Sequence, residues 1–141
     1  MADEVAAPAR VDVPRWRLYT LRAAYLVLVA GLGTYIWPLV IRHDNAFALD
    51  SGIQTSLLAG LGAAALLGLR YPLKMLPLLL FELIWKAIYL VAFALPLWSS
   101  HAITPAAAQD INSVLMVVIF IPLIPWGYVW RQYVVGRGEP W

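Results

Sequence analysis

The chain has 141 residues, of which 62% are hydrophobic and 13% are charged, and its formal net charge is +2. A soluble domain of this size needs far more polar surface, so the composition predicts a single-domain membrane protein and excludes a separate soluble catalytic module. The sequence contains no cysteine, which excludes disulfides and thiolate metal sites.

The chain begins with residues 1–15, whose polar, proline-containing sequence predicts a disordered cytoplasmic tail. An apolar run over residues 18–41 follows. This run is too long for the hydrophobic core of a signal peptide and predicts the first membrane span. Trp16 and Trp37 lie near its two ends, as expected at membrane–water interfaces. Pro38 lies where the helix is expected to end.

The second span is predicted over residues 51–69, after a short polar loop at 42–50. Asp50 or Ser51 is expected to cap it by accepting a hydrogen bond from a free backbone N–H group. Small residues recur every four positions along the span, a pattern that lets membrane helices approach closely. Their partner is either another helix of the chain or a second copy in a homodimer. The members of this register are Gly52, Ser56, Gly60, Ala64 and Gly68.

The third span is predicted over residues 73–98 and the fourth over residues 111–130. Pro122 and Pro125 are expected to kink the fourth span, because each removes a backbone hydrogen bond. Together the four spans predict an all-α fold, a transmembrane four-helix bundle. The side chains expected to cap the fourth span are Gln109, Asp110 and Asn112.

Positive charges predict how this domain, residues 16–133, is oriented in the membrane. If the N-terminus is cytoplasmic, eight Arg and Lys side chains fall on the inner side and Arg42 alone on the outer side. This distribution follows the positive-inside rule on every loop. Both termini, including a second tail at 134–141, are therefore predicted to be cytoplasmic. The inner side chains are Arg10, Arg15, Arg17, Arg22, Arg70, Lys74, Arg131 and Arg137.

Glu82 and Lys86 are the main candidates for a functional site, because both lie within the third span. A charge at the centre of a membrane helix costs about 2.5–3.5 kcal/mol on insertion scales. Residues four apart share one helix face, so the two charges can neutralise each other. One interpretation is a proton-linked or ligand-binding site, which also includes Tyr89 on the same face. The other is an internal ion pair that only fixes the rotation of the helix.

Three polar side chains of the first two spans are possible hydrogen-bond partners of this pair: Tyr25, Tyr35 and Gln54. Four side chains on the predicted outer side could bind a metal in principle, but their spacing matches no ligand motif, so no metal or other cofactor is predicted. These four are His43, Asp44, His101 and Asp110. The basic residues are flanked by interfacial aromatic residues, which indicates contact with anionic lipid rather than with nucleic acid.

The four-span layout of residues 16–133, with short loops and both termini inside, resembles small bacterial membrane proteins of the DoxX-like kind. The segment from Arg70 through Lys86 to Trp98 is similar to that of bacterial integral membrane proteins. This resemblance implies a helical bundle and an accessory role in a membrane complex.

The sequence thus predicts a multi-pass protein of a bacterial inner membrane, either alone in the lipid bilayer, as a homo-oligomer or within a larger complex. Its predicted role is that of a non-enzymatic accessory or small-ligand-binding component. The first alternative is a minimal proton-coupled transporter that acts as a homodimer. The second is a membrane-embedded enzyme that acts on a lipid or a quinone.

Overall fold

The computed structural model describes residues 13–42, 45–138 and 140, and for residues 45–50 it describes the backbone alone. This part of the chain is helical and contains no strand. Four helical stretches are long and apolar enough to cross a membrane. The predicted all-α fold with four spans is confirmed. The stretches are Arg15–Arg42, Ser51–Arg70, Leu76–Ser99 and Pro105–Leu123.

The first hairpin consists of α1 (Arg15–Tyr35), α2 (Trp37–Arg42) and α3 (Asn45–Arg70). Pro38 has no N–H group to donate to the carbonyl four residues earlier, and the helix is interrupted by a turn at Ile36. It then continues to Arg42 instead of ending at Pro38.

The start of α3 differs from the sequence prediction. Residues 45–50 were expected to form a loop, but the helix begins at Asn45. The cap predicted at Asp50 or Ser51 is therefore wrong, because both residues lie inside the helix. Alanine and leucine at positions 46, 48 and 49 favour helix, which explains the earlier start. His43 and Asp44 lie outside the described residues.

The second hairpin begins after a tight turn in which the Met75 N–H donates to the Tyr71 carbonyl at 3.0 Å. The third span is continuous through α4 (Leu76–Tyr89), the π-helical segment η1 (Leu90–Ala94) and α5 (Leu95–Ser99). Pro96 removes one donor from this span, and the wider π turn lies directly before it.

The third span ends in a Schellman motif centred on His101, whose φ of 53° is in the left-handed region. The His101 N–H donates to the Trp98 carbonyl at 3.2 Å, and the Ala102 N–H donates to the Leu97 carbonyl at 3.0 Å. These bonds satisfy carbonyls that the end of the helix would leave unpaired.

The fourth span starts with α6 (Pro105–Leu115), and Thr104 is its N-cap: the Thr104 hydroxyl accepts from the Ala107 N–H at 3.2 Å. The caps predicted at Gln109, Asp110 and Asn112 are wrong, because these residues lie inside α6. Threonine followed by proline is a strong start signal, since threonine caps well and proline suits the first helical position. Two 3₁₀ segments complete the span, η2 (Met116–Ile119) and η3 (Ile121–Leu123).

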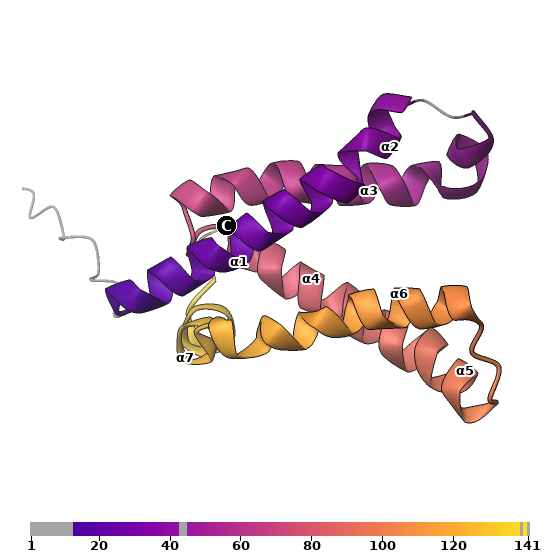
Figure 1. Cartoon of the computed structure of the whole chain (residues 1–141). Coiled ribbons are helices and arrows are strands. Elements are labelled where there is room, and N and C mark those ends of the chain that lie inside the picture. Colours follow the sequence, from indigo (N-terminus) through magenta and orange to yellow (C-terminus); the bar gives the residue numbers. More distant parts are fainter. Residues whose placement is uncertain (1–12, 43–44, 139, 141) are drawn as a thin grey trace, which may run out of the picture.

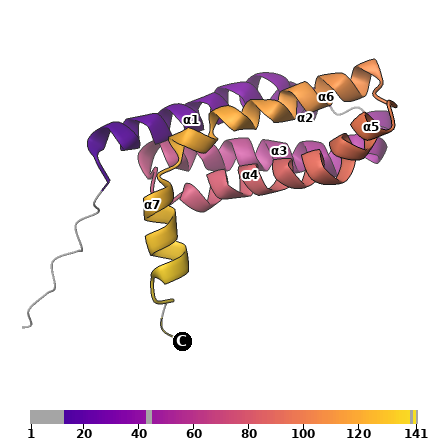
Figure 2. The ribbon, with the colours of Figure 1, turned by 90° about the horizontal axis from the view of Figure 1, so that it is seen from below.

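The prolines of the fourth span break it rather than only kink it. Ile124 is extended, with φ −75° and ψ 130°, and Pro125 follows. The chain then continues as α7 (Trp126–Val129) and the π-helical segment η4 (Trp130–Val135), which run at a steep angle to the four spans (Figure 2). The indole N–H of Trp126 donates to the Ile121 carbonyl at 2.7 Å, the carbonyl that Pro125 leaves unpaired. Segments α7 and η4, which contain Trp126, Trp130 and Tyr133, therefore lie across one end of the four spans.

The core lies at the end of the molecule where the two hairpins meet, and beyond it they diverge (Figure 1). The larger contacts between the hairpins join α1 to η3 and α3 to α4. Many apolar side chains outside this core are exposed, as expected for helices surrounded by lipid. The buried core residues are Leu21, Ala24, Tyr25, Leu28, Ala65, Leu76, Leu79 and Ile124.

Candidate functional site

The buried face of α4 carries Glu82 into the protein. Leu76, Leu79 and Glu82 follow each other at intervals of three, so they share the face that packs against the core. Glu82 is 5% exposed, and it is one of two buried polar or charged residues among those described. A carboxylate one turn after two core leucines is removed from water, so it needs hydrogen-bond or ion-pair partners nearby.

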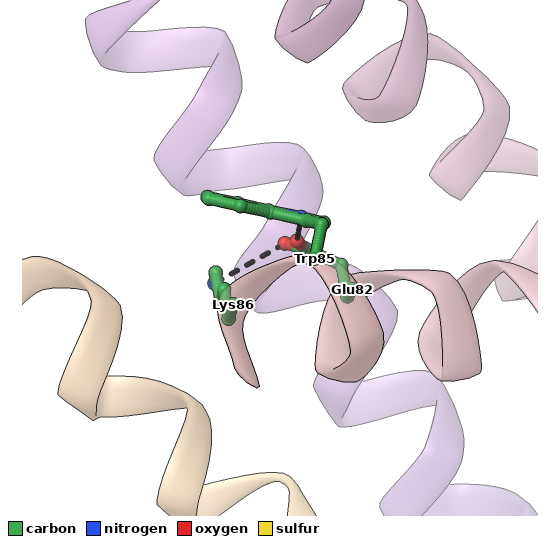
Figure 3. A network of polar contacts seen from close by, with 3 residues as sticks. All are labelled: Glu82, Trp85 and Lys86. Carbon is green, nitrogen blue, oxygen red and sulfur yellow. Dashed lines mark hydrogen bonds and ion pairs between the residues drawn. The ribbon is translucent and has the colours of Figure 1, made fainter. Parts of the chain in front are cut away.

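Both oxygens of the Glu82 carboxylate have a donor on the same helix (Figure 3). The Lys86 Nζ lies 3.3 Å from Oε1. The indole Nε1–H of Trp85 donates to Oε2. The Lys86 Nζ also lies 5.3 Å from the centroid of the Trp85 ring, within the range of a cation–π interaction. The three side chains therefore form one compact cluster, called here the α4 triad.

The sequence prediction identified the ion pair of this triad but missed Trp85. A tryptophan three residues after Glu82 can reach its carboxylate, because positions i and i+3 are neighbours on a helix. That spacing is the signal that would have found it.

The contacts of the triad are confined to α4. Among the described residues, no hydrogen bond or ion pair joins Glu82, Trp85 or Lys86 to another element. An ammonium group has three N–H donors, and its one ion-pair partner among the described residues is Glu82. The Lys86 side chain is 13% exposed. The triad thus neutralises its own charge yet keeps donor capacity on Lys86.

The triad lies where the hairpins begin to diverge. Glu82 is about 4.5 Å beyond the core residue Leu79 along the helix, and Lys86 is about 6 Å further. The midpoint of the span Leu76–Ser99 falls between positions 87 and 88. Lys86 is therefore the charge nearest the centre of the span, and Glu82 is one turn closer to the core.

The structure does not bring the predicted supporting side chains to this triad. The Tyr25 hydroxyl is fully buried and donates to the Pro72 carbonyl at 2.9 Å, where it ties α1 to the turn before α4. Tyr25, a possible partner of the ion pair from the sequence, thus donates its hydroxyl to a different group. Tyr35 is 77% exposed and Gln54 is also exposed. Tyr89 stacks on Phe93, with the ring centroids 6.1 Å apart.

The small residues of α3 differ in what they contact. A Cβ at Gly68 would lie 2.3 Å from the Tyr25 ring, so this glycine permits a close approach of α1 and α3. Gly60, by contrast, has nothing within 4 Å of such a Cβ. Ser56 is exposed, while Gly52 and Ala64 are half-buried. Gly62, outside the register, packs against Leu32 with a Cβ distance of 3.0 Å.

One shallow groove on the third span is unrelated to the triad. It has a volume of about 370 Å³ and is lined by Ala87, Ile88, Val91 and Ala92. At 3.6 residues per turn these positions lie on the side of the helix opposite Lys86. The groove is therefore a feature of the outer surface and adds nothing to the site.

No protein-family model, no curated protein and no solved structure matches this chain. The four-span layout fits a small multi-pass membrane protein. The resemblance to DoxX-like proteins rests on that layout alone.

Proposed function

We propose that this small integral membrane protein binds an amphipathic small molecule at the α4 triad and serves as an accessory component of a bacterial inner membrane. The ligand presents a hydrogen-bond acceptor, a carbonyl or an acidic oxygen, to the Lys86 ammonium. Its apolar part lies among the diverging hairpins and the surrounding lipid.

The observation that carries this proposal is that the triad makes its polar contacts within one helix. An ion pair between two helices would help to hold them together, whereas a pair within one helix leaves both groups free of any contact between helices. Glu82 and Lys86 contribute no such bond among the described residues. The ion pair itself offsets the cost of placing the Glu82 and Lys86 charges in the membrane. A purely structural role for the pair gives no partner to the remaining N–H donors of Lys86. A ligand with an acceptor accounts for them.

The positive-inside rule supports an orientation with both termini cytoplasmic. The described basic residues outside the triad, apart from Arg42, lie at the start of α1, around the α3–α4 turn and after α7. These segments are at the end of the molecule where the hairpins meet (Figure 1). In this orientation a ligand enters between the hairpins from the outer half of the bilayer.

Association with a second copy or a larger complex belongs to the same proposal. Ser56 and Gly60 are exposed on α3, and their small size would let another membrane helix approach closely.

The geometry supports ligand binding better than proton transport. A proton carrier needs groups that pass the proton on, and two candidates further along the chain are exposed: His101 in the α5–α6 loop and Asp110 on α6. The Glu82 carboxylate is already engaged by two donors of its own helix. The transporter hypothesis is therefore less well supported than the binding hypothesis.

The test is to extract the protein gently from its membrane and to identify the amphipathic molecules that copurify, by mass spectrometry. Lys86→Met is expected to lose a molecule that the wild type retains. Lys74→Met is the matched control, because it removes the other lysine of this region, which is exposed and stacks on Tyr71. An identical set of molecules with both variants would contradict the proposal.

A further inference from the structure

A second polar site lies where the start of α1 meets α7, away from the α4 triad. It is a cavity of about 170 Å³. Its walls are formed by the chain before α1, by Arg17 of α1, and by residues 125–128 and Arg131 at the break that follows the fourth span. Two guanidinium groups thus line one cavity, from segments more than a hundred positions apart in the sequence.

Each guanidinium group is held in place by a backbone carbonyl. An Nη1–H of Arg17 donates to the Ile124 carbonyl at 3.3 Å, and this group also lies 4.8 Å from the Trp16 ring centroid. The Nε–H of Arg131 donates to the Gly127 carbonyl at 3.3 Å. An arginine has five N–H donors, so each keeps several for a ligand. The two groups are therefore positioned before any ligand arrives.

No described carboxylate balances these two charges. The carboxylates whose side chains the structure describes are Glu82, which is engaged in the α4 triad, and Asp110, which is exposed on α6. Two like charges on one cavity repel each other, and an anion between them would remove that repulsion. Arginine pairs favour phosphate in particular, because the planar fork donates two parallel hydrogen bonds to its oxygens.

The location indicates where such a phosphate comes from. The segment from Trp126 onward turns across the end of the spans, and Trp126, Trp130 and Tyr133 are exposed. Exposed aromatic residues next to arginines are typical of the headgroup level of a bilayer. A cavity of 170 Å³ has room for a phosphate group and some water, since a water takes roughly 30 Å³ in the liquid.

We propose that the cavity between Arg17 and Arg131 binds a phosphate group, supplied by the headgroup of an anionic phospholipid. Arg17 donates from the spanning helix and Arg131 from the segment after the break. The lipid thereby fixes α7 against the start of α1.

The experiment is native mass spectrometry of the full chain during titration with phosphatidylglycerol, with phosphatidylcholine as the neutral lipid. We expect one tightly bound phosphatidylglycerol. Arg131→Gln should weaken its binding about tenfold, because charge-assisted hydrogen bonds are lost, and Arg17→Gln with Arg131→Gln should weaken it further. Arg70→Gln is the matched control. It removes an exposed arginine that does not line the cavity, and it should change the affinity less than about twofold.

Two further arms complete the test. If millimolar inorganic phosphate displaces phosphatidylglycerol, the cavity binds phosphate but its ligand is a soluble one. If inorganic phosphate does not displace it, the ligand is the lipid. Equal weakening by Arg70→Gln and Arg131→Gln would overturn the proposal, since it would mean a diffuse attraction to positive charge. So would unchanged binding in Arg131→Gln. If Arg17→Gln fails to fold, Arg131→Gln alone decides, because its bond to Gly127 lies within its own helical segment.

Discussion

Single residues decide how closely the helices of the first hairpin approach. Gly68 lies against the buried Tyr25 ring, whose hydroxyl is fixed by the Pro72 carbonyl, whereas Gly60 faces open space on the same helix. The sequence register treats these two glycines alike. Their environments in the folded chain are opposite.

Gly68→Ala should therefore destabilise the protein by roughly 1–3 kcal/mol, because the added Cβ overlaps the buried Tyr25 ring, whose hydroxyl is hydrogen-bonded to Pro72. Gly33→Ala in α1 is the control: a Cβ there meets nothing within 4 Å, so this variant should gain about 0.5–1 kcal/mol, since alanine favours helix. Thermal unfolding in one detergent measures both. An equal loss in both variants would show that the overlap with Tyr25 is not what destabilises Gly68→Ala.

His101 offers a second test at the same scale. Its φ of 53° costs a residue with a side chain roughly 1–2 kcal/mol, and glycine avoids that cost. His101→Gly should raise the stability by about 1 kcal/mol. Ser100→Gly, at φ −86°, should give no gain. A destabilised His101→Gly would indicate that the imidazole has a role beyond ending the helix.

At the scale of elements, the effect on stability of replacing one member of the α4 triad is expected to depend on whether the other two are present. Removing one partner of a buried ion pair costs about 3–5 kcal/mol, because the other charge is left uncompensated. Glu82→Leu and Lys86→Met are each expected to lose stability in this range. Glu82→Leu also leaves the Trp85 indole N–H without its acceptor.

The combined variant Glu82→Leu, Trp85→Phe and Lys86→Met should recover most of that loss, because no polar group is left unpaired. The double variant that keeps Trp85 should recover less, by about 1–3 kcal/mol. A thermodynamic cycle from thermal unfolding separates these terms. Losses that simply add would show that the three side chains do not interact.

The elements also show how far the sequence predicts this fold. Four spans are predictable because apolar length alone determines them. The start of α6 is also predictable, because Thr104 and Pro105 form a standard helix start. The cap was instead predicted among the more polar residues that follow. The complete break at Ile124 was predicted only as a kink, because the path of a chain after two prolines depends on what it packs against.

At the scale of the whole molecule, the sequence predicted a bundle but not its divergence. The core is restricted to one end, and that depends on how Tyr25, Leu76 and Ile124 meet in three dimensions. For the site, the helix spacing predicted the pair Glu82 and Lys86. It did not show that Tyr25 is engaged elsewhere, since tertiary contacts decide its partner.

The orientation of the whole molecule is tested with single cysteines, which have no background in this chain. Ala106 and Tyr71 are both exposed. Ala106 is in the first turn of α6 and Tyr71 directly follows α3, and these two helix ends lie at opposite ends of the molecule (Figure 1). Ala106→Cys should be labelled by an impermeant reagent from outside the cell, and Tyr71→Cys should not. Labelling of position 71 from outside would reverse the topology and move the phosphate site to the outer surface.

Ligand binding by the α4 triad is tested most directly by native mass spectrometry of the gently extracted protein. The wild type is compared with the variant Glu82→Leu, Trp85→Phe and Lys86→Met, which is expected to be stable because it removes the site without leaving a buried charge. We expect the wild-type mass to exceed that of the polypeptide by one small amphipathic molecule, and the variant to lack it. Equal retention of the same molecule by both proteins, or a wild type that carries none, would contradict binding at the triad.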